Sequence, residues 1–293
     1  MEPFKNGGRE SERFVIYCKT YKHHLPQVER LVRSIEKHNV DNIPVVISIN
    51  PGDRKQEFVD ALGTDITILD DREVYEINNV VGPLDGWRYQ QVIKSNFYRT
   101  NIARNYLCID SDIFFIKDFS LTDFMYADDI YTICHESKDM LEWMTLNGHD
   151  MDRVFYQSAQ RLLRTAFGNN NYPLWDWGPS PFIWSCEVWR EFNENYLAPT
   201  GLFFETFLKK FESTGVNFSE YVLYGEWLWA NQTIKVIPRQ PLSKIYHWKE
   251  QFVDEFNRGV RMSHLTQNYI CVGIQSNWAA SLGHSMLHEF MEN

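Results

Sequence analysis

The chain has 293 residues, and 44% of them are hydrophobic, which is enough to bury a sizeable core. Its formal net charge of -10 argues against nucleic acid as a main partner, because binding to a duplex needs clustered lysine and arginine. The polar amino terminus lacks the apolar segment of a signal peptide, and no later apolar run approaches the ~18 residues that span a bilayer. The five cysteines are scattered and show no metal-ligand spacing, so we expect a cytoplasmic protein with reduced thiols.

The first third of the chain alternates between strand and helix patterns. Apolar runs and amphipathic spacing predict a strand at 13–20, a helix at 24–38, a strand at 43–49, a helix at 54–62 and a strand at 65–70. Such a βαβ opening is typical of α/β domains. It therefore predicts a mostly parallel sheet flanked by helices.

Two carboxylates follow an apolar strand in the run 105–115, whose sequence is Asn-Tyr-Leu-Cys-Ile-Asp-Ser-Asp-Ile-Phe-Phe. Open α/β sheets bind ligands at the carboxyl ends of their strands, which is where we expect Asp110 and Asp112. Once the strand ends and turns, both side chains can converge on one divalent cation while Ser111 caps the bend. Such a cation keeps open positions for phosphate oxygens. An ordinary strand-end turn is the alternative interpretation of the same three residues.

The preceding run, 86–98, has helix-like apolar spacing and leads directly into the acidic strand. Its Gly-Trp-x-x-Gln-Gln-x-x-Lys pattern and the Asp-x-Asp pair together resemble GT-A glycosyltransferases of bacterial polysaccharide loci, loosely over 13–248. The resemblance implies a GT-A (Rossmann-like) fold and a metal-dependent transfer of sugar from a nucleotide-sugar donor to a hydroxyl of a surface glycan. That glycan would be of the capsule, O-antigen or lipopolysaccharide type. In such enzymes Asp110 and Asp112 would anchor a Mn²⁺ or Mg²⁺ ion against the donor diphosphate.

The resemblance also implies a domain organisation. After a flexible terminus at 1–12, residues 13–130 would form the nucleotide-sugar-binding half, and 131–293 the helical, acceptor-binding half of one domain. Within the second half, 138–168 has an apolar helical face interrupted near Asn147-Gly148. This face predicts core packing, and peripheral membrane contact is the alternative, because polysaccharide enzymes often meet lipid-linked glycan acceptors. The protein would then work at the inner face of the membrane.

Several residues of the first half are candidates for contact with the donor. In GT-A enzymes the loop after the first strand commonly holds the base and ribose, which assigns Thr20 and Tyr21 to that role. Asp70 ends the third predicted strand and could bind uracil or ribose, although a strand-end turn describes it equally well. Arg88 and Lys94 precede the acidic strand and are candidate phosphate contacts, with a solvated helix charge as the alternative for each.

The run 171–185 combines proline and glycine with three tryptophans around one carboxylate, Asp176. Sugars present apolar C–H faces and a polar rim, so an aromatic ring beside an acid suits the wall of a sugar pocket. In similar enzymes a turn of this kind lines the donor sugar and the acceptor. We therefore assign Asp176 to sugar binding, or to catalysis if no other carboxylate is the base. Some of the rings must belong to the core.

Ser219 can cap a helix whose first turn contains Glu220, where a carboxylate is favoured electrostatically. In glycosyltransferases of this general shape, this position often carries the catalytic base. Glu226 faces about 120° away on a regular helix, so both glutamates reach one pocket only if Gly225 breaks the helix. His247 resembles the carboxyl-side histidine that GT-A enzymes use as a further metal ligand, and a buried structural histidine is the alternative.

Two other classes of function are compatible with these patterns. A haloacid-dehalogenase-like phosphohydrolase also places Asp-x-Asp after a strand to bind Mg²⁺. There, however, a small hydroxyl residue closely follows the second Asp, whereas Ile113 and Phe114 follow here. A non-catalytic module could bind sugar or nucleotide through the aromatic residues alone. The remaining segment, 250–293, is helical in pattern, and 275–278 could close over the site.

Overall fold

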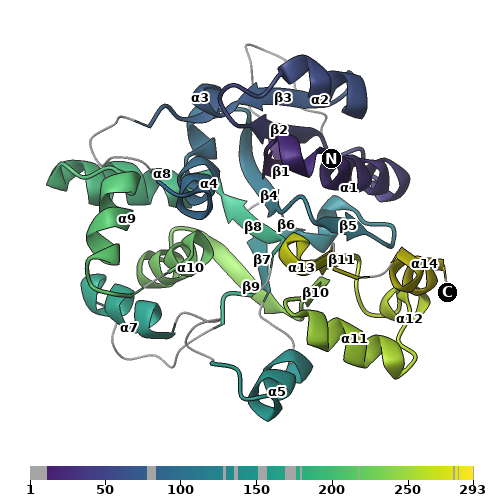
Figure 1. Ribbon diagram of the computed structural model, residues 1–293. Coiled ribbons are helices and arrows are strands. Elements are labelled where there is room, and N and C mark those ends of the chain that lie inside the picture. Colours follow the sequence, from purple (N-terminus) through teal and green to yellow (C-terminus); the bar gives the residue numbers. More distant parts are fainter. Residues whose placement is uncertain are drawn as a thin grey trace.

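The protein is represented by a computed structural model (Figure 1) that describes most of the chain. The described residues are 12–77, 84–127, 130–134, 138–150, 157–168, 176–178, 180–216, 218–279, 281–282 and 284–292. Nearly all of the terminus expected to be flexible, 1–12, therefore lies outside them, as does 171–175 in the tryptophan-rich run.

A five-stranded sheet forms the centre of the molecule (Figure 1). Its strands are β1 (Glu12–Thr20), β2 (Val45–Ile49), β3 (Thr67–Asp70), β4 (Ala103–Ile109) and β8 (Phe182–Ser185), in the order β3-β2-β1-β4-β8. The first four are parallel to their neighbours, and β8 runs antiparallel to β4. The predicted α/β class is thus confirmed, but the sheet is mixed, because the second half of the chain contributes an antiparallel edge strand.

The alternation of side chains along β1 explains why helices cover both faces of this sheet. Phe14, Ile16 and Cys18 join one buried cluster, whereas Val15 and Tyr17 join another. The first cluster includes helices α1 (Leu25–His38) and α2 (Lys55–Leu62), and the second includes α4 (Gly86–Ser95), α8 (Cys186–Arg190) and α10 (Glu220–Asn231). The two groups lie on opposite sides of the sheet (Figure 1).

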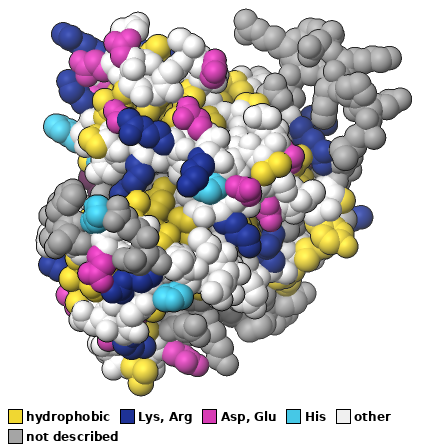
Figure 2. Space-filling view, turned by 90° about the vertical axis from the view of Figure 1, so that its right-hand side faces the viewer, with side chains coloured by type: hydrophobic (Ala, Val, Ile, Leu, Met, Phe, Trp, Pro, Cys, Tyr) yellow, Lys and Arg dark blue, Asp and Glu magenta, His cyan; other side chains and the backbone are white. Residues whose placement is uncertain are grey.

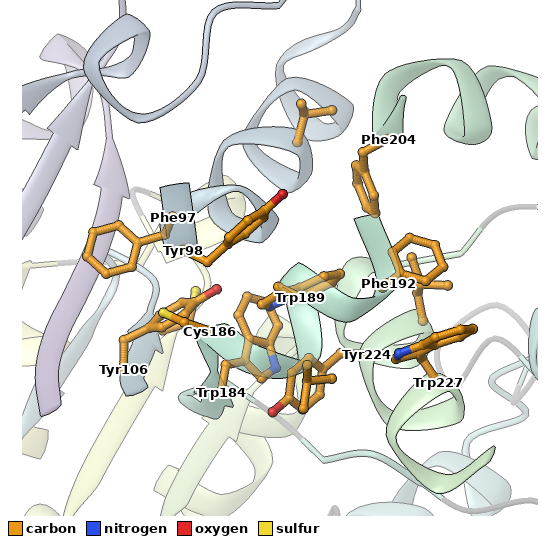
Figure 3. Close-up of a cluster of buried hydrophobic side chains, with 14 of the residues drawn as sticks. Phe97, Tyr98, Tyr106, Trp184, Cys186, Trp189, Phe192, Phe204, Tyr224 and Trp227 are labelled. Carbon is orange, nitrogen blue, oxygen red and sulfur yellow. The ribbon is translucent and has the colours of Figure 1, made fainter. Parts of the chain in front are cut away.

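The second cluster is unusually aromatic, as Figure 3 shows. Trp184 of β8 packs edge-on against Tyr106 of β4 and Trp189 of α8, with ring centroids 5.7 and 5.2 Å apart. The backbone amide of Ser185 donates a hydrogen bond to the hydroxyl of Tyr224 on α10 at 2.8 Å. These contacts join the two halves of the chain in one core, and they assign Trp184 to packing.

Two smaller sheets flank the main one. One contains β10 (Ser243–Tyr246), β11 (Cys271–Ile274) and β5 (Ile113–Phe115), and the other contains β6 (Met125–Ala127), β7 (Ile130–Cys134) and β9 (Lys235–Arg239). The strand predicted to end at the two aspartates is β4, and after the turn that carries them the chain continues as β5 in a different sheet. The helical prediction for 250–293 was wrong at β11, which pairs with both β10 and β5.

The remaining elements are helical and mostly peripheral. They are η1 (Lys22–His24), α3 (Asp71–Val74), η2 (Phe97–Thr100), η3 (Leu121–Asp123), α5 (Lys138–Leu146), α7 (Gln157–Ala166), η4 (Glu191–Leu197), η5 (Ala198–Thr200), α9 (Phe204–Glu212), α11 (Lys249–Asn257), α12 (Met262–Leu265), α13 (Ser276–Ala279) and α14 (His284–Glu292). The predicted apolar face at 138–168 is divided between α5 and α7, where Met140, Met144 and Leu163 are buried. In the part of the chain that the structure describes, no helix is long and apolar enough to cross a membrane.

On the face drawn in Figure 2, lysine and arginine side chains are interspersed with aspartate and glutamate. The described side chains there do not form the continuous basic surface that a duplex nucleic acid needs.

Candidate functional site

A cavity of about 1760 Å³ opens along the carboxyl ends of the parallel strands. It lies where β1 and β4 are neighbours although the chain passes from β1 to β2 on the other side, which is the topological switch point where such sheets bind ligands. We divide the described residues that line it into three groups. The β1 end comprises Lys19, Thr20, Tyr21, Asn50, Trp87 and Tyr89; the centre comprises His24, Lys94, Asp110, Ser111, Asp112 and Glu220; and the α5 end comprises His149, Asp150, Tyr221, His247 and Trp248.

Asp110 is paired with a buried lysine in the centre of the cavity. The Lys94 ammonium lies 2.6 Å from Asp110 Oδ1 and 3.5 Å from Glu220 Oε1, and only 4% of the lysine side chain is exposed. Lys94 is on the last turn of α4, so the helix that precedes the acidic strand places a cation between two carboxylates. Lys94, the predicted phosphate contact, lines the same cavity as the two aspartates.

Asp112 is held by the end of β11 and by the residues that follow it. The backbone amide of Ser276 donates to Asp112 Oδ2 at 3.0 Å, and the amide of Ile274 donates to the Asp112 carbonyl at 3.2 Å. Burial, followed by the negative charge of Asp110, raises the pKa of Asp112 to about 6. Residues 275–277 line the cavity at this point. They belong to the segment, 275–278, for which the sequence analysis suggested closure over the site.

Ser111 connects the acidic turn to the loop after β1. Its hydroxyl lies 3.1 Å from His24 Nδ1, and the other ring nitrogen of His24 lies 3.0 Å from the Tyr21 hydroxyl. Partial burial lowers the pKa of His24, and the nearby Asp110 charge acts in the opposite direction. Sequence analysis missed His24, because its proximity to Ser111 depends on the pairing of β1 with β4.

The donor set at the centre suits a hard cation that a ligand helps to hold. In the described part of the chain, no group of three or more His, Cys, Asp or Glu side chains is arranged to hold a metal by itself. His247 lines the cavity but does not complete such a group with the two aspartates. Mg²⁺ typically binds through one or two carboxylates plus substrate phosphates, so a pair of aspartates at a cavity wall fits this mode. The mutual repulsion that raises the pKa of Asp112 would also be relieved by a dication.

At the β1 end, one hydroxyl lacks a partner. Thr20 is 2% exposed, and its Oγ1 is buried with no hydrogen-bond partner among the described residues. The adjacent Lys19 is fully engaged, since its ammonium donates to Asn50 Oδ1 and the Thr20 carbonyl, both at 2.6 Å, and lies 2.9 Å from Asp71. Burial lowers the pKa of Lys19 and raises that of Asp71 to about 6. A polar ligand atom would satisfy Thr20.

Four candidate residues do not line the cavity. Asp70 caps α3 by accepting from the Arg72 amide at 2.9 Å, and its side chain pairs with the Arg72 guanidinium. Arg88 is paired with Asp85 and, at 3.0 Å, with Glu212. The side chains of Asp70 and Arg88, which the sequence assigned to donor contacts, are therefore engaged in local ion pairs outside the cavity lining.

The other two, Asp176 and Glu226, have structural partners as well. Asp176 Oδ1 accepts from the Gly178 amide at 2.9 Å, which shapes the turn before β8. Glu226 is buried, where Arg164 donates to both of its oxygens at 2.7 and 3.1 Å and Trp177 Nε1 donates at 2.9 Å. Because α10 continues through Gly225, Glu226 does not join Glu220 in the cavity.

Glu220 itself lines the cavity at the start of α10. The predicted N-cap position of Ser219 is confirmed, but its hydroxyl does not cap the helix. It donates instead to Glu220 Oε2 at 2.6 Å, while Lys94 approaches Oε1. The glutamate is thus oriented from both sides toward the acidic turn.

The fold and this site define an α/β protein with a large polar cavity at the carboxyl ends of its parallel strands. The chain belongs to a family of unknown function (DUF6492), whose model matches residues 13–265. No curated protein matches the chain. The matched region contains every residue that we place in the centre of the cavity.

Proposed function

We propose that this protein is a metal-dependent glycosyltransferase that moves a sugar from a nucleotide-sugar donor to a hydroxyl of a bacterial surface glycan. The observation that supports it most is the position of Asp110 and Asp112 at the switch point of the sheet. They lie in one cavity that both polar and aromatic side chains line. The unpartnered Thr20 hydroxyl and the aromatic side chains at the β1 end suit a nucleoside. The α5 end would receive the glycan or lipid-linked glycan acceptor, at the cytoplasmic face of the membrane.

Asp110 and Asp112 would hold Mn²⁺ or Mg²⁺. When bound, the cation would neutralise the diphosphate that leaves with the nucleotide. Lys94 adds a fixed positive charge beside Asp110, and its ammonium can donate to a phosphate oxygen of the donor. His24 fixes Ser111, and the Ser276 amide fixes Asp112, so both sides of the acidic turn are positioned before a ligand binds.

Glu220 is the carboxylate best placed to accept the proton of an acceptor hydroxyl in an inverting transfer. It lines the cavity beside Lys94, and the Ser219 hydroxyl and Lys94 orient its two oxygens. Glu226 and Asp176 are unsuited to this role, because their carboxylates hold structural partners outside the cavity lining.

Ligand-dependent stabilisation tests the proposal. Thermal-shift measurements with a panel of nucleoside diphosphates and nucleotide-sugars, with and without Mn²⁺, should identify one nucleotide that raises the melting temperature only in the presence of the metal. Asp110→Asn and Asp112→Asn should each remove that shift and the transfer of sugar, because losing one charged ligand removes most of the cation affinity. Asp118→Asn is the matched control, since Asp118 is exposed and pairs with His38 away from the cavity.

Metal-independent shifts, or shifts that survive in both central variants, would contradict the metal assignment. Release of inorganic phosphate from phosphate esters without any sugar transfer would favour a phosphohydrolase. Nucleotide or sugar binding without turnover would favour a non-catalytic binding module.

A further inference from the structure

At the α5 end of the cavity, three rings lie together, those of Trp143, His149 and Trp248. We call this group the aromatic wall. The rings of His149 and Trp248 are stacked with centroids 4.3 Å apart, and those of Trp143 and His149 are stacked at 5.0 Å. Trp143 and Trp248 complete the triangle at 5.5 Å. His149 and Trp248 line the cavity. Trp143 is not among the lining residues and packs against both rings. The wall joins the loop after α5 to the start of α11 (Figure 1).

This wall is separate from the main cores of the molecule. Buried Met140 and Met144 pack with Trp143 and Trp248 in a small cluster of their own. Trp278 Nε1 donates to the carbonyl of His247 at 3.2 Å, which fixes the backbone next to Trp248. The rings are therefore held in place, yet they remain half-buried at the cavity surface. Core packing alone does not require two of them to line a cavity.

The charges around the wall define which ligands fit it. The carboxylates of Asp150 and Glu220 both line the cavity, and Glu220 lies 3.5 Å from the Lys94 ammonium. Among the described lining residues, the lysines are Lys19 and Lys94, and each is already paired with a carboxylate. The cavity therefore offers the flat rings of the wall together with hydrogen-bond acceptors. Both of its described lining lysines are already compensated by carboxylates. A neutral pyranose matches this set, because its C–H face packs on a ring while its hydroxyls donate to carboxylates.

The size of the cavity leaves room for such a ligand in addition to a nucleotide. Pockets for one small ligand or cofactor typically enclose about 300–1,000 Å³. The cavity here encloses about 1760 Å³, and its two ends lie on either side of the carboxylate pair. A nucleotide at the β1 end would leave the aromatic wall accessible.

We propose that the aromatic wall is a subsite for a neutral hexose ring of the acceptor glycan, and that it discriminates against acidic sugars. This inference rests on the proposed function, which it deepens by naming the acceptor class. Ring stacking positions the acceptor at the cavity surface, and the described lining carboxylates, which outnumber the lining lysines four to two, repel uronates and sialic acids.

The test measures glycan binding and nucleotide binding separately on the full chain. Fluorescently labelled protein is applied to an array of neutral and acidic oligosaccharides, and Mn²⁺ with each nucleoside diphosphate is titrated by calorimetry. Trp248→Ala should lower the affinity for neutral glycans at least about tenfold and leave diphosphate binding unchanged. His149→Ala, in a half-buried loop position, is a second variant in case Trp248→Ala does not fold. Trp229→Ala is the matched control, because Trp229 is also a tryptophan with an accessible side chain but lies outside the cavity lining.

Binding of neutral glycans that falls in both wall variants and persists in Trp229→Ala would support the subsite. No binding of neutral glycans, a preference for acidic ones, or wall variants that bind like the wild type would overturn it. Diphosphate binding reports on the proposed function independently. If the wall binds neutral glycans but no nucleotide binds with any metal, the subsite stands and the transferase proposal fails.

Discussion

At the scale of single residues, Lys94 sets the charge of the candidate metal site. Its ammonium lies 2.6 Å from an oxygen of Asp110, so a cation that approaches the two aspartates meets a buried positive charge. Lys94→Met keeps most of the side-chain volume and removes that charge. We expect the affinity for Mn²⁺ alone to rise about tenfold, as electron paramagnetic resonance titration would measure.

Arg88→Met is the control for this experiment. Arg88 lies on the same helix, but it pairs with Asp85 and Glu212 outside the cavity lining. Its variant should bind Mn²⁺ like the wild type. Unchanged Mn²⁺ affinity in Lys94→Met would mean that the ammonium does not compete with the metal.

Under the proposed metal role, Asp112 should make metal binding depend on pH. Its pKa is raised to about 6, chiefly by burial, so its ionised fraction falls as the pH decreases through 6. Only the carboxylate binds a cation, and the metal must displace the proton at low pH. Mn²⁺ affinity should therefore be about tenfold weaker at pH 5 than at pH 7. Calorimetry at the two values would measure this difference, and Asp112→Asn should show weak binding at both.

At the scale of elements, α10 depends on a glycine that sequence analysis had considered as a helix breaker. The helix continues through Gly225, and a Cβ there would lie 2.1 Å from Trp177 Cδ2. Gly225→Ala gains about 1 kcal/mol of helix propensity, whereas overpacking typically costs about 1–3 kcal/mol. Since Trp177 also donates to the buried Glu226, the clash should prevail. We expect the melting temperature to fall by several degrees in a calorimetric scan.

Gly86→Ala provides the comparison for that variant, because Gly86 also lies in a helix but has open space around its Cβ position. Its melting temperature should stay the same or rise slightly. Equal melting temperatures for the wild type and Gly225→Ala would show that Trp177 shifts at little cost.

The elements of the first half could be predicted from the sequence because their signals are local. The apolar face of α1 contains Val28, Leu31, Val32 and Ile35, which are all buried, and this spacing is readable without tertiary information. β11 was missed because it has four residues, one of them Gly273, and lies between helical patterns. Its position between β10 and β5 explains why Gly273 is needed, since a Cβ there would lie 2.6 Å from Ile245 Cδ1 of β10 and 3.1 Å from Ile113 Cγ1 of β5. Pairing of this kind depends on contacts far apart in the sequence.

At the scale of the whole molecule, site residues could be predicted where they follow a strand. The prediction failed where a neighbouring residue pairs with the same side chain. Thr20, Asp110 and Asp112 follow from the rule that ligands bind at the carboxyl ends of parallel strands. Asp70 satisfies the same rule, yet the neighbouring Arg72 and the cap of α3 engage its side chain. His24 required the opposite information, because only the folded sheet places it beside Ser111. Sequence position therefore indicates which edge is used, and tertiary contacts decide which side chains remain accessible.

The two glutamates of α10 should separate catalysis from the stability of the whole molecule. Glu226 receives two hydrogen bonds from buried Arg164 and one from Trp177, so Glu226→Gln leaves a buried guanidinium without its charge partner. Breaking a buried ion pair in this way typically costs about 3–5 kcal/mol, which should lower the melting temperature markedly. Glu220→Gln should cost less, because Lys94 keeps its closer partner, Asp110.

Turnover should show the reverse order for these two variants. If Glu220 is the base, Glu220→Gln cannot accept the acceptor proton, and kcat should fall by about 10²-fold or more with donor affinity nearly unchanged. Glu226→Gln, assayed well below its melting temperature, should retain most of its activity, since its side chain does not line the cavity. Melting curves and initial rates of sugar transfer for both variants measure the two effects together. Wild-type turnover in Glu220→Gln would remove the glutamate from the mechanism and favour a retaining transfer, which needs no base at this position.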